Sequence, residues 1–329
     1  MKIVCDEHIP FLVEAVRREW QEVEICPMKP EEMDASAVRE ADVLVVRTRT
    51  RVNEALLSGS RVRLVCTATI GYDHIDTAWC EAHGVRWMSC PGCNAQAVCD
   101  YIEEALEELS AVSHQPSAVN RRLSELTIGV VGVGHVGSLV ARMARRRGMN
   151  VLLNDPPKGI GGPLSFIAQN SDIVTFHTPL AKDGTYATYH LCDEAFLSRC
   201  KPGAVIINAA RGGVVDEQAL LRSGHPYIID TWENEPFPDE KVLSCAFRAS
   251  MHIAGYSVAG KRNASQMCLD TIAEIFRLNR INTAMYPYSG REGDTSSGWL
   301  ERITTALKAQ PGQFETLRKS YPLRGEQVR

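Results

Sequence analysis

Three polar side chains in the second half of the sequence have the types needed to move a proton and bind an anion. They are Arg211 in INAARGGVVD, Glu235 in DTWENEP and His252 in MHIAGYS. An imidazole titrates near neutral pH, so His252 could accept or donate a proton. Glu235 could hold the imidazole tautomer and raise its proton affinity. The planar fork of Arg211 matches a carboxylate. Together they predict oxidation of an alcohol carbon beside a carboxylate.

A glycine-rich turn upstream of these residues predicts a dinucleotide site. An expected strand at 126–134 enters the turn, an expected helix at 135–147 leaves it, and the next strand ends at Asp155. Such a turn lets backbone N–H groups approach a pyrophosphate at a helix N-terminus. Asp155 would accept hydrogen bonds from the adenosine ribose and repel a 2′-phosphate, which favours NAD; only the nearby Lys158 would favour NADP. The residues of the turn are Gly132, Gly134, His135, Val136 and Gly137.

The elements that must position these residues follow an alternating pattern. Short apolar runs alternate with amphipathic stretches, as in a doubly wound parallel α/β sheet. We expect strands at 2–6, 23–27, 42–47, 63–69 and 85–90, and again at 126–134, 150–155, 172–178, 204–210 and 226–232. We expect helices at 10–19, 31–41, 74–83, 94–113, 135–147 and 257–278, with a further one possible at 298–309. The polar segment 113–124 predicts a boundary, and 286–298 a linker.

Composition limits the possible functions. A chain of 329 residues should form two domains. A net charge of −4 gives no reason to expect nucleic acid or a membrane surface as a partner. The sequence has neither a signal-peptide pattern nor an apolar run of about 20 residues, so we expect a cytoplasmic protein. Its 11 cysteines are scattered, which favours reduced core thiols. The pair Cys90 and Cys93 leaves a redox or metal site as the alternative.

These motifs together resemble the D-isomer-specific 2-hydroxyacid dehydrogenase family. The similarity extends over nearly the whole chain and includes TATIGYDHID, CPGCNAQAV, TFHTPLAKDG, INAARGGVVDEQAL and HIAGYSVAGK. It implies two Rossmann-like domains with an active-site cleft between them. The substrate domain would be discontinuous, 1–95 plus 263–285, and 96–262 would bind NAD. Residues 286–329 would form a linker and a reduced C-terminal dimerisation segment, which implies a homodimer.

The resemblance also implies roles for single residues. Arg211 and His252 would be catalytic, with Glu235 as the acidic partner. The substrate would contact Thr48, Thr69 and Tyr256. Further contacts to NAD would come from Thr178, Ala209, Ala210, Arg211, Asp230 and Gly255.

Other assignments stay open at the level of sequence. Arg47 is our own candidate for binding a substrate phosphate, although alternating arginines after a strand are also typical of a solvated edge. His177 could be structural or could lie beside the cofactor. His135 and Met251 stand where the family usually has asparagine and proline. Two alternative functions remain: a dehydrogenase of the 3-phosphoglycerate or glycerate type, and an NADH-sensing corepressor that does not catalyse a reaction.

Overall fold

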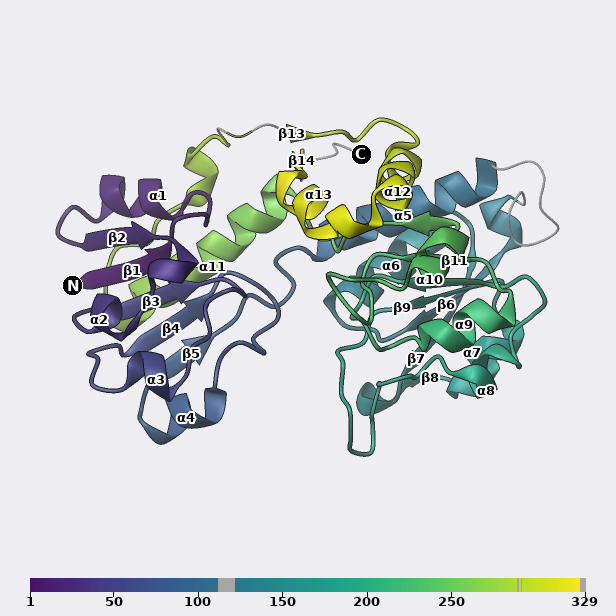
Figure 1. The fold of residues 1–329 in the computed structure, drawn as a ribbon, viewed down its shortest axis with the longest axis horizontal. Helices are drawn as coiled ribbons and strands as arrows, with labels where there is room; N and C mark the ends of the chain where they lie inside the picture. Colours follow the sequence, from purple (N-terminus) through teal and green to yellow (C-terminus); the bar gives the residue numbers. More distant parts are fainter. Residues whose placement is uncertain (112–121, 289, 291, 326–329) are drawn as a thin grey trace. The chain divides into compact units, whose positions relative to one another are not determined.

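The computed structural model describes residues 1–111, 122–288, 290 and 292–325, so the predicted boundary at 113–124 lies mostly outside the described residues. The chain forms two compact units (Figure 1). One contains Met1–Asn94 and Ser257–Glu292, and the other contains Ala95–Tyr256 and Gly293–Gln327. Both are α/β units built on a mainly parallel sheet, as the alternating pattern predicts.

The first unit is built on a five-stranded parallel sheet in the order β2-β1-β3-β4-β5. Its central strands are buried throughout, which explains their continuous apolar sequence. The strands are β1 (Lys2–Asp6), β2 (Glu24–Met28), β3 (Val43–Val46), β4 (Leu64–Thr67) and β5 (Arg86–Met88). The helices are α1 (Leu12–Glu19), α2 (Ala35–Val38), α3 (Glu54–Leu57), α4 (Thr77–Ala82) and α11 (Val258–Phe276), with short 3-10 turns at Pro30–Glu32 and Thr283–Met285.

The helix predicted at 31–41 is wrong in length. Only a 3-10 turn and the single turn of α2 form there. Asp34 separates them because its carboxylate accepts the backbone N–H groups of Ser36 and Ala37 and so begins a new helix.

The second unit is built on a seven-stranded sheet in the order β12-β11-β10-β9-β6-β7-β8. All neighbouring strands are parallel except β7 and β8. The strands are β6 (Thr127–Val131), β7 (Asn150–Asp155), β8 (Ile160–Gly161), β9 (Ile173–Phe176), β10 (Val205–Asn208), β11 (Tyr227–Ile229) and β12 (Arg248–Ala249). The helices are α5 (Ala95–Ala111), α6 (His135–Arg146), α7 (Leu164–Asn170), α8 (Glu194–Leu197), α9 (Glu217–Ser223) and α10 (Glu240–Cys245), with 3-10 turns at Leu123–Glu125 and Pro156–Lys158.

Two strands of this sheet, β8 and β12, are absent from the sequence prediction. Each has only two residues, which is too short to show a period. The edge strand β12 leads directly to His252.

The C-terminal tail, residues 293–325, packs into the second unit. It contains α12 (Trp299–Ala309), a 3-10 turn at Pro311–Gln313, α13 (Phe314–Ser320) and β14 (Leu323–Arg324), and β13 (Glu292–Gly293) precedes α12. Figure 1 shows α12, in yellow, alongside α5. Glu104 of α5 accepts the N–H of Gly298, and Glu108 accepts the N–H groups of Leu300 and Glu301 at 3.1 Å each. These carboxylates satisfy the free N–H groups at the start of α12.

The tail, predicted as a linker and a reduced dimerisation segment at 286–329, packs on the second unit. Trp299, Leu300, Leu307 and Phe314 are buried in the same core as the seven-stranded sheet. Residues 257–262 also fall with the first unit, because α11 is one continuous helix from Val258. Among the described residues, no helix has the length and apolar character that crossing a membrane would require.

We expect Glu108→Ala to lower the free energy of unfolding by about 3 kcal/mol, because it frees the first turn of α12 and removes the buried carboxylate that pairs with Arg248. Urea unfolding followed by circular dichroism measures this loss. The matched control is Glu107→Ala on the same helix, whose partly exposed carboxylate pairs with Arg147 and should cost about 1 kcal/mol or less. Equal losses in the two variants would contradict the role of Glu108 in docking the tail.

Candidate active site

The three candidate catalytic residues follow the ends of three neighbouring parallel strands. Arg211 follows β10, Glu235 follows β11 and His252 follows β12. Parallel strands present their carboxyl ends at one edge of the sheet, where ligands bind in open α/β folds. The sheet thus brings to one edge three residues that are up to 41 positions apart, from 211 to 252, in the sequence.

His252 and Glu235 form a hydrogen-bonded pair. Nδ1 of His252 lies 2.8 Å from Oε2 of Glu235, whose Oε1 accepts the N–H of Trp232 at 2.8 Å. Burial alone would raise the pKa of Glu235, but the hydrogen bond and charge of His252, the N–H of Trp232 and the charge of Arg318 together lower it. An ionised Glu235 makes Nδ1 the protonated ring nitrogen, which leaves the lone pair of Nε2 to accept a proton. The His252 side chain is 34% exposed, so the ring is reachable.

The backbone at His252 is strained and is held by a buried acid. His252 has a φ of 58°, in the left-handed region that non-glycine residues rarely adopt. The carbonyl of Asp230 accepts the N–H of His252 at 2.8 Å. The Asp230 carboxylate accepts the N–H groups of Ile253 and Ala254, at 2.7 and 3.0 Å, and the hydroxyl of Ser250. Asp230 is 1% exposed, so these bonds are made in a dry environment and fix the loop after His252.

Arg211 is held by a buried asparagine that the sequence analysis did not single out. The Asn208 side chain donates to the carbonyl of Arg211 at 3.0 Å and to that of Thr231 at 3.3 Å, and it accepts the N–H of Ala210. It therefore joins the loops that follow β10 and β11. The Arg211 guanidinium donates through Nη1 to the carbonyl of Ala210 at 2.7 Å, which restricts its direction.

Close packing of these two loops also requires a glycine. A Cβ at Gly212 would lie 1.9 Å from the carbonyl oxygen of Trp232, so no side chain fits there. The loop that contains Arg211 consequently packs directly against the loop that leads to Glu235.

The glycine turn has the geometry of a dinucleotide cradle. Gly132 has a φ of 87°, and a Cβ on it would lie 2.8 Å from the carbonyl of His177. A Cβ on Gly137 would lie 1.9 Å from the Gly132 oxygen, whereas one on Gly134 would meet open space. Helix α6 begins immediately after this turn, at His135, and the N–H groups at a helix N-terminus can bind a phosphate.

Asp155 lies at the end of β7 beside this turn. Its Oδ2 accepts the N–H of Val133 at 2.8 Å, which ties the acid to the turn. Lys158 donates to the carbonyl of Val133 at 2.8 Å and lies 3.7 Å from the Asp155 carboxylate. The charge of Lys158 is thus directed toward Asp155 and the turn.

Two buried polar atoms beside the turn lack a partner among the described residues. They are Oγ1 of Thr178 and Nδ1 of His177. His177 bonds to Thr175 through Nε2, and burial lowers its pKa to about 3, so the ring is neutral. An unpaired buried polar atom is unfavourable, and a ligand in the cradle would supply partners. These residues therefore fit a bound NAD.

The other predicted site residues have defined surroundings. Ala209 and Ala210 are buried, Gly255 is half-buried, and Tyr256 accepts a hydrogen bond from Arg318. In the first unit, Thr69 Oγ1 donates to the carbonyl of Gly71 at 2.9 Å. Their contacts with NAD or substrate remain predictions.

Arg47 and Thr48 follow β3 in the first unit. Arg47 donates from Nε and Nη2 to the carboxylate of Asp6, which is fully buried, at 2.8 and 3.2 Å. This pair fixes the start of the loop that follows β3. Thr48 lines a hollow with Arg49, Arg51, Asp73 and His74.

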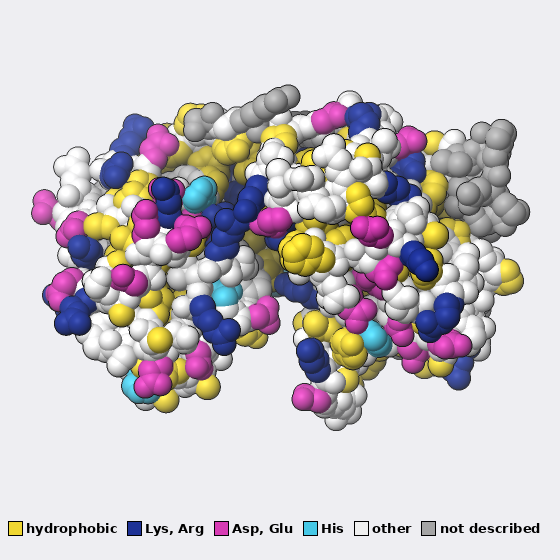
Figure 2. Space-filling view, viewed as in Figure 1, with side chains coloured by type: hydrophobic (Ala, Val, Ile, Leu, Met, Phe, Trp, Pro, Cys, Tyr) yellow, Lys and Arg dark blue, Asp and Glu magenta, His cyan; other side chains and the backbone are white. Residues whose placement is uncertain are grey.

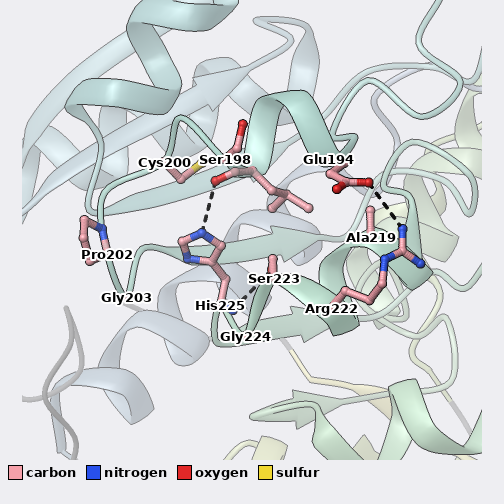
Figure 3. Close-up of a pocket in the computed structure, with 11 residues that line it drawn as sticks. Glu194, Ser198, Cys200, Pro202, Gly203, Ala219, Arg222, Ser223, Gly224 and His225 are labelled. Atoms are coloured by element: carbon pink, nitrogen blue, oxygen red, sulfur yellow. Dashed lines mark hydrogen bonds and ion pairs between the residues drawn. The ribbon is translucent and has the colours of Figure 1, made fainter.

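A separate pocket of the second unit lies at the amino ends of β10 and β11, opposite to the carboxyl ends that Arg211 and Glu235 follow (Figure 3). His225 lines it and precedes β11, and its Nδ1 and Nε2 lie 3.1 and 3.3 Å from the carbonyl oxygens of Ala204 and Leu197. Arg222 pairs with Glu194 at 3.7 Å. These groups lie at the end of the sheet opposite to the one that Arg211, Glu235 and His252 follow.

The charges on one face of the molecule are mixed in sign (Figure 2), and the pair Cys90 and Cys93 is buried. Basic and acidic side chains are interspersed over the face shown in Figure 2. Cys90 donates to the carbonyls of Thr67 and Ala264, and burial raises the pKa of Cys93 to about 12, so both act as protonated core thiols. No group of three or more metal-ligating side chains occurs in the part of the chain that the structure describes.

Comparison with known proteins agrees with this geometry. Residues 96–255 match the D-isomer specific 2-hydroxyacid dehydrogenase, NAD binding domain. An erythronate-4-phosphate dehydrogenase of Bacteroides fragilis is 42% identical over 99% of this chain and 97% of its own length. That of Porphyromonas gingivalis is 38% identical over 98% of this chain and 92% of its own. The chain belongs to the D-isomer specific 2-hydroxyacid dehydrogenases. Within that family it belongs with the erythronate-4-phosphate dehydrogenases.

Solved structures of two other dehydrogenases share the fold. A 3-phosphoglycerate dehydrogenase of Entamoeba histolytica with bound NAD+ has a TM-score of 0.70 at 24% identity, covering 84% of this chain and 95% of its own. A D-lactate dehydrogenase of Aquifex aeolicus with NAD and lactic acid has a TM-score of 0.64 at 24% identity, covering 84% and 96%. These structures confirm the two-domain Rossmann architecture. The match of residues 96–255 to the NAD binding domain confirms NAD as the cofactor of this 2-hydroxyacid dehydrogenase.

One further acid near the site was not predicted. Glu217, in the first turn of α9, is buried and accepts the N–H of Glu233 at 2.7 Å, two residues before Glu235. Burial raises the pKa of Glu217 to about 7. The only sequence signal was an acidic residue at the start of a helix, which is ordinary for an exposed position.

We expect Glu217→Gln to change how stability depends on pH. Because the folded protein holds this proton up to about pH 7 and the unfolded chain releases it near pH 4.5, wild-type stability should fall across that range. The glutamine cannot ionise, so the variant lacks this fall in stability, while its amide oxygen can still accept the N–H of Glu233. Relative to wild type, its free energy of unfolding should therefore rise by up to about 3 kcal/mol between pH 4.5 and pH 8. A difference between the two proteins that is constant with pH would contradict the assignment.

Proposed function

We propose that this dehydrogenase oxidises 4-phospho-D-erythronate to (R)-3-hydroxy-2-oxo-4-phosphooxybutanoate with NAD, as a step of vitamin B6 biosynthesis. The observation that carries the proposal is the pair of His252 and Glu235 at the sheet edge shared with Arg211. The erythronate-4-phosphate dehydrogenases that match nearly the whole chain support the choice of substrate.

His252 acts as the base. Nδ1 stays bonded to Glu235, and Nε2 takes the proton of the C2 hydroxyl. The imidazolium that forms lies 2.8 Å from the carboxylate, which stabilises its positive charge. NAD, when bound, accepts the hydride from C2. The reaction thus yields the 2-oxo acid, NADH and one proton, which His252 later releases.

Arg211 binds the substrate carboxylate. Its guanidinium is held in direction by the carbonyl of Ala210 and presents its remaining donors to an anion. The positive charge also polarises the carbonyl that develops at C2. We further propose that Thr48, Thr69 and Tyr256 contact the substrate.

The substrate phosphate would bind in the arginine-rich loop that follows β3. Arg47 remains our candidate, and its pairing with Asp6 orients the guanidinium while it reduces the local positive charge. Arg49 and Arg51, which line the hollow beside Thr48, would add charge for a dianion.

We also propose that the protein is a cytoplasmic homodimer. Support for a reducing compartment comes from its cysteines, all of which are free thiols. The dimer rests on the family resemblance of the C-terminal segment.

The proposal is tested by NADH formation at 340 nm with 4-phospho-D-erythronate, 3-phosphoglycerate and glycerate. We expect 4-phospho-D-erythronate to be preferred, and His252→Ala to lower kcat by about a thousandfold because the base is lost. The control His83→Ala removes an exposed imidazole at the end of α4 and should leave kcat within twofold. Preference for another acid would contradict the substrate. NADH binding without any turnover would contradict the enzymatic function.

A further inference from the structure

The C-terminal tail returns to the loop that contains His252. Capping by Glu104 and Glu108 fixes the start of α12, and Phe314 at the start of α13 is fully buried. This docking directs two arginines of the tail, Arg318 and Arg324, at residues 253–256.

Arg324 donates hydrogen bonds to backbone carbonyl groups of this loop. Its Nε donates to the carbonyl of Tyr256 at 3.1 Å, and its Nη2 donates to Ala254 and, at 3.4 Å, to Ile253. Its guanidinium also lies 4.8 Å from the ring centre of Trp299. The side chain is almost fully buried, and multiple carbonyl partners and an aromatic face are what a buried guanidinium requires.

Arg318 binds a side chain of the same loop, that of Tyr256. Its Nε donates to the Tyr256 hydroxyl at 3.2 Å, and the side chain is 27% exposed. Burial would lower the pKa of Arg318, but Tyr256 and Glu235 outweigh it and raise the pKa. The charge of Arg318 therefore acts on both Tyr256 and Glu235.

We infer that the tail belongs to the active site and that Arg318 is a positioning residue, acting through the Tyr256 hydroxyl. Arg324 fixes the backbone of residues 253–256, and Arg318 then sets the direction of the Tyr256 side chain. The inference rests on the proposed function, in which Tyr256 contacts the substrate. The tail thereby has a role within its own subunit, distinct from the dimerisation expected of it.

The test compares Arg318→Gln with Lys319→Gln in the full chain. Lys319 is the next residue of α13, is exposed and pairs with Glu315, so its variant loses the same charge from the same helix. We expect Arg318→Gln to lower kcat/KM for the hydroxy acid 4-phospho-D-erythronate by roughly 10- to 100-fold. The Kd for NADH should stay within twofold of the wild-type value. Lys319→Gln should leave both values within twofold.

A double-mutant cycle with Tyr256→Phe separates positioning from a general structural effect. If Arg318 acts through the hydroxyl, the double variant should be no more than threefold slower than Tyr256→Phe alone. Losses that multiply would overturn the inference, as would an Arg318→Gln variant with wild-type kcat/KM. If Arg318→Gln does not fold, Arg318→Lys takes its place in the test. Normal NADH binding with at least a fivefold loss of kcat/KM then supports the inference, and an unchanged kcat/KM overturns it. Wild-type protein without turnover on any hydroxy acid would instead refute the proposed function.

Discussion

The loop of residues 252–256 contains the proposed base His252, and this catalytic loop is held between two buried opposite charges on which the proposed site depends. The Asp230 carboxylate binds the N–H groups of Ile253 and Ala254, while the guanidinium of Arg324 binds carbonyls of the same short segment. The left-handed backbone of His252 is unfavourable by itself. Because both faces of the following backbone are bonded to buried ions, the loop cannot relax without leaving a charge unpaired in the interior. The imidazole therefore stays directed at Glu235.

The rest of the second unit supports these two ions. Asp230 follows β11 directly and receives the hydroxyl of Ser250, which in turn bonds to Tyr101 on α5. The indole of Trp232 donates to the carbonyl of Ser250 at 2.8 Å. Arg324 reaches the loop only because the tail docks on α5, where Nη2 also donates to the carbonyl of Ala97. Helix α5 thus supports the catalytic loop twice: Tyr101 bonds to Ser250, and the carbonyl of Ala97 accepts a hydrogen bond from Arg324.

The sequence predicted the longer strands and the glycine turn, because each has a local pattern. It also named Arg211, Glu235 and His252, which the sheet brings to one edge, but their roles in proton transfer and anion binding are still predictions. Apolar runs mark the buried strands, and glycines spaced as 132, 134 and 137 mark the cradle. It did not predict β12, Asn208 as a link between loops, or the role of Arg324. A two-residue strand has no period, and a buried asparagine resembles any strand-end residue. Arg324 lies about 70 residues from the carbonyls that it binds, so only the folded tail brings them together.

The most direct test of this account is amide hydrogen exchange, resolved to single residues, in the wild-type protein. In the wild type, the N–H groups of Ile253 and Ala254 should exchange only through global unfolding of the second unit, at the rate of the amides in β10 and β11. In an Arg324→Lys variant, these two N–H groups should exchange at least tenfold faster than the amides of those strands. Fast exchange of both amides in the wild type, or protection that the substitution leaves unchanged, would show that the paired ions do not hold the catalytic loop.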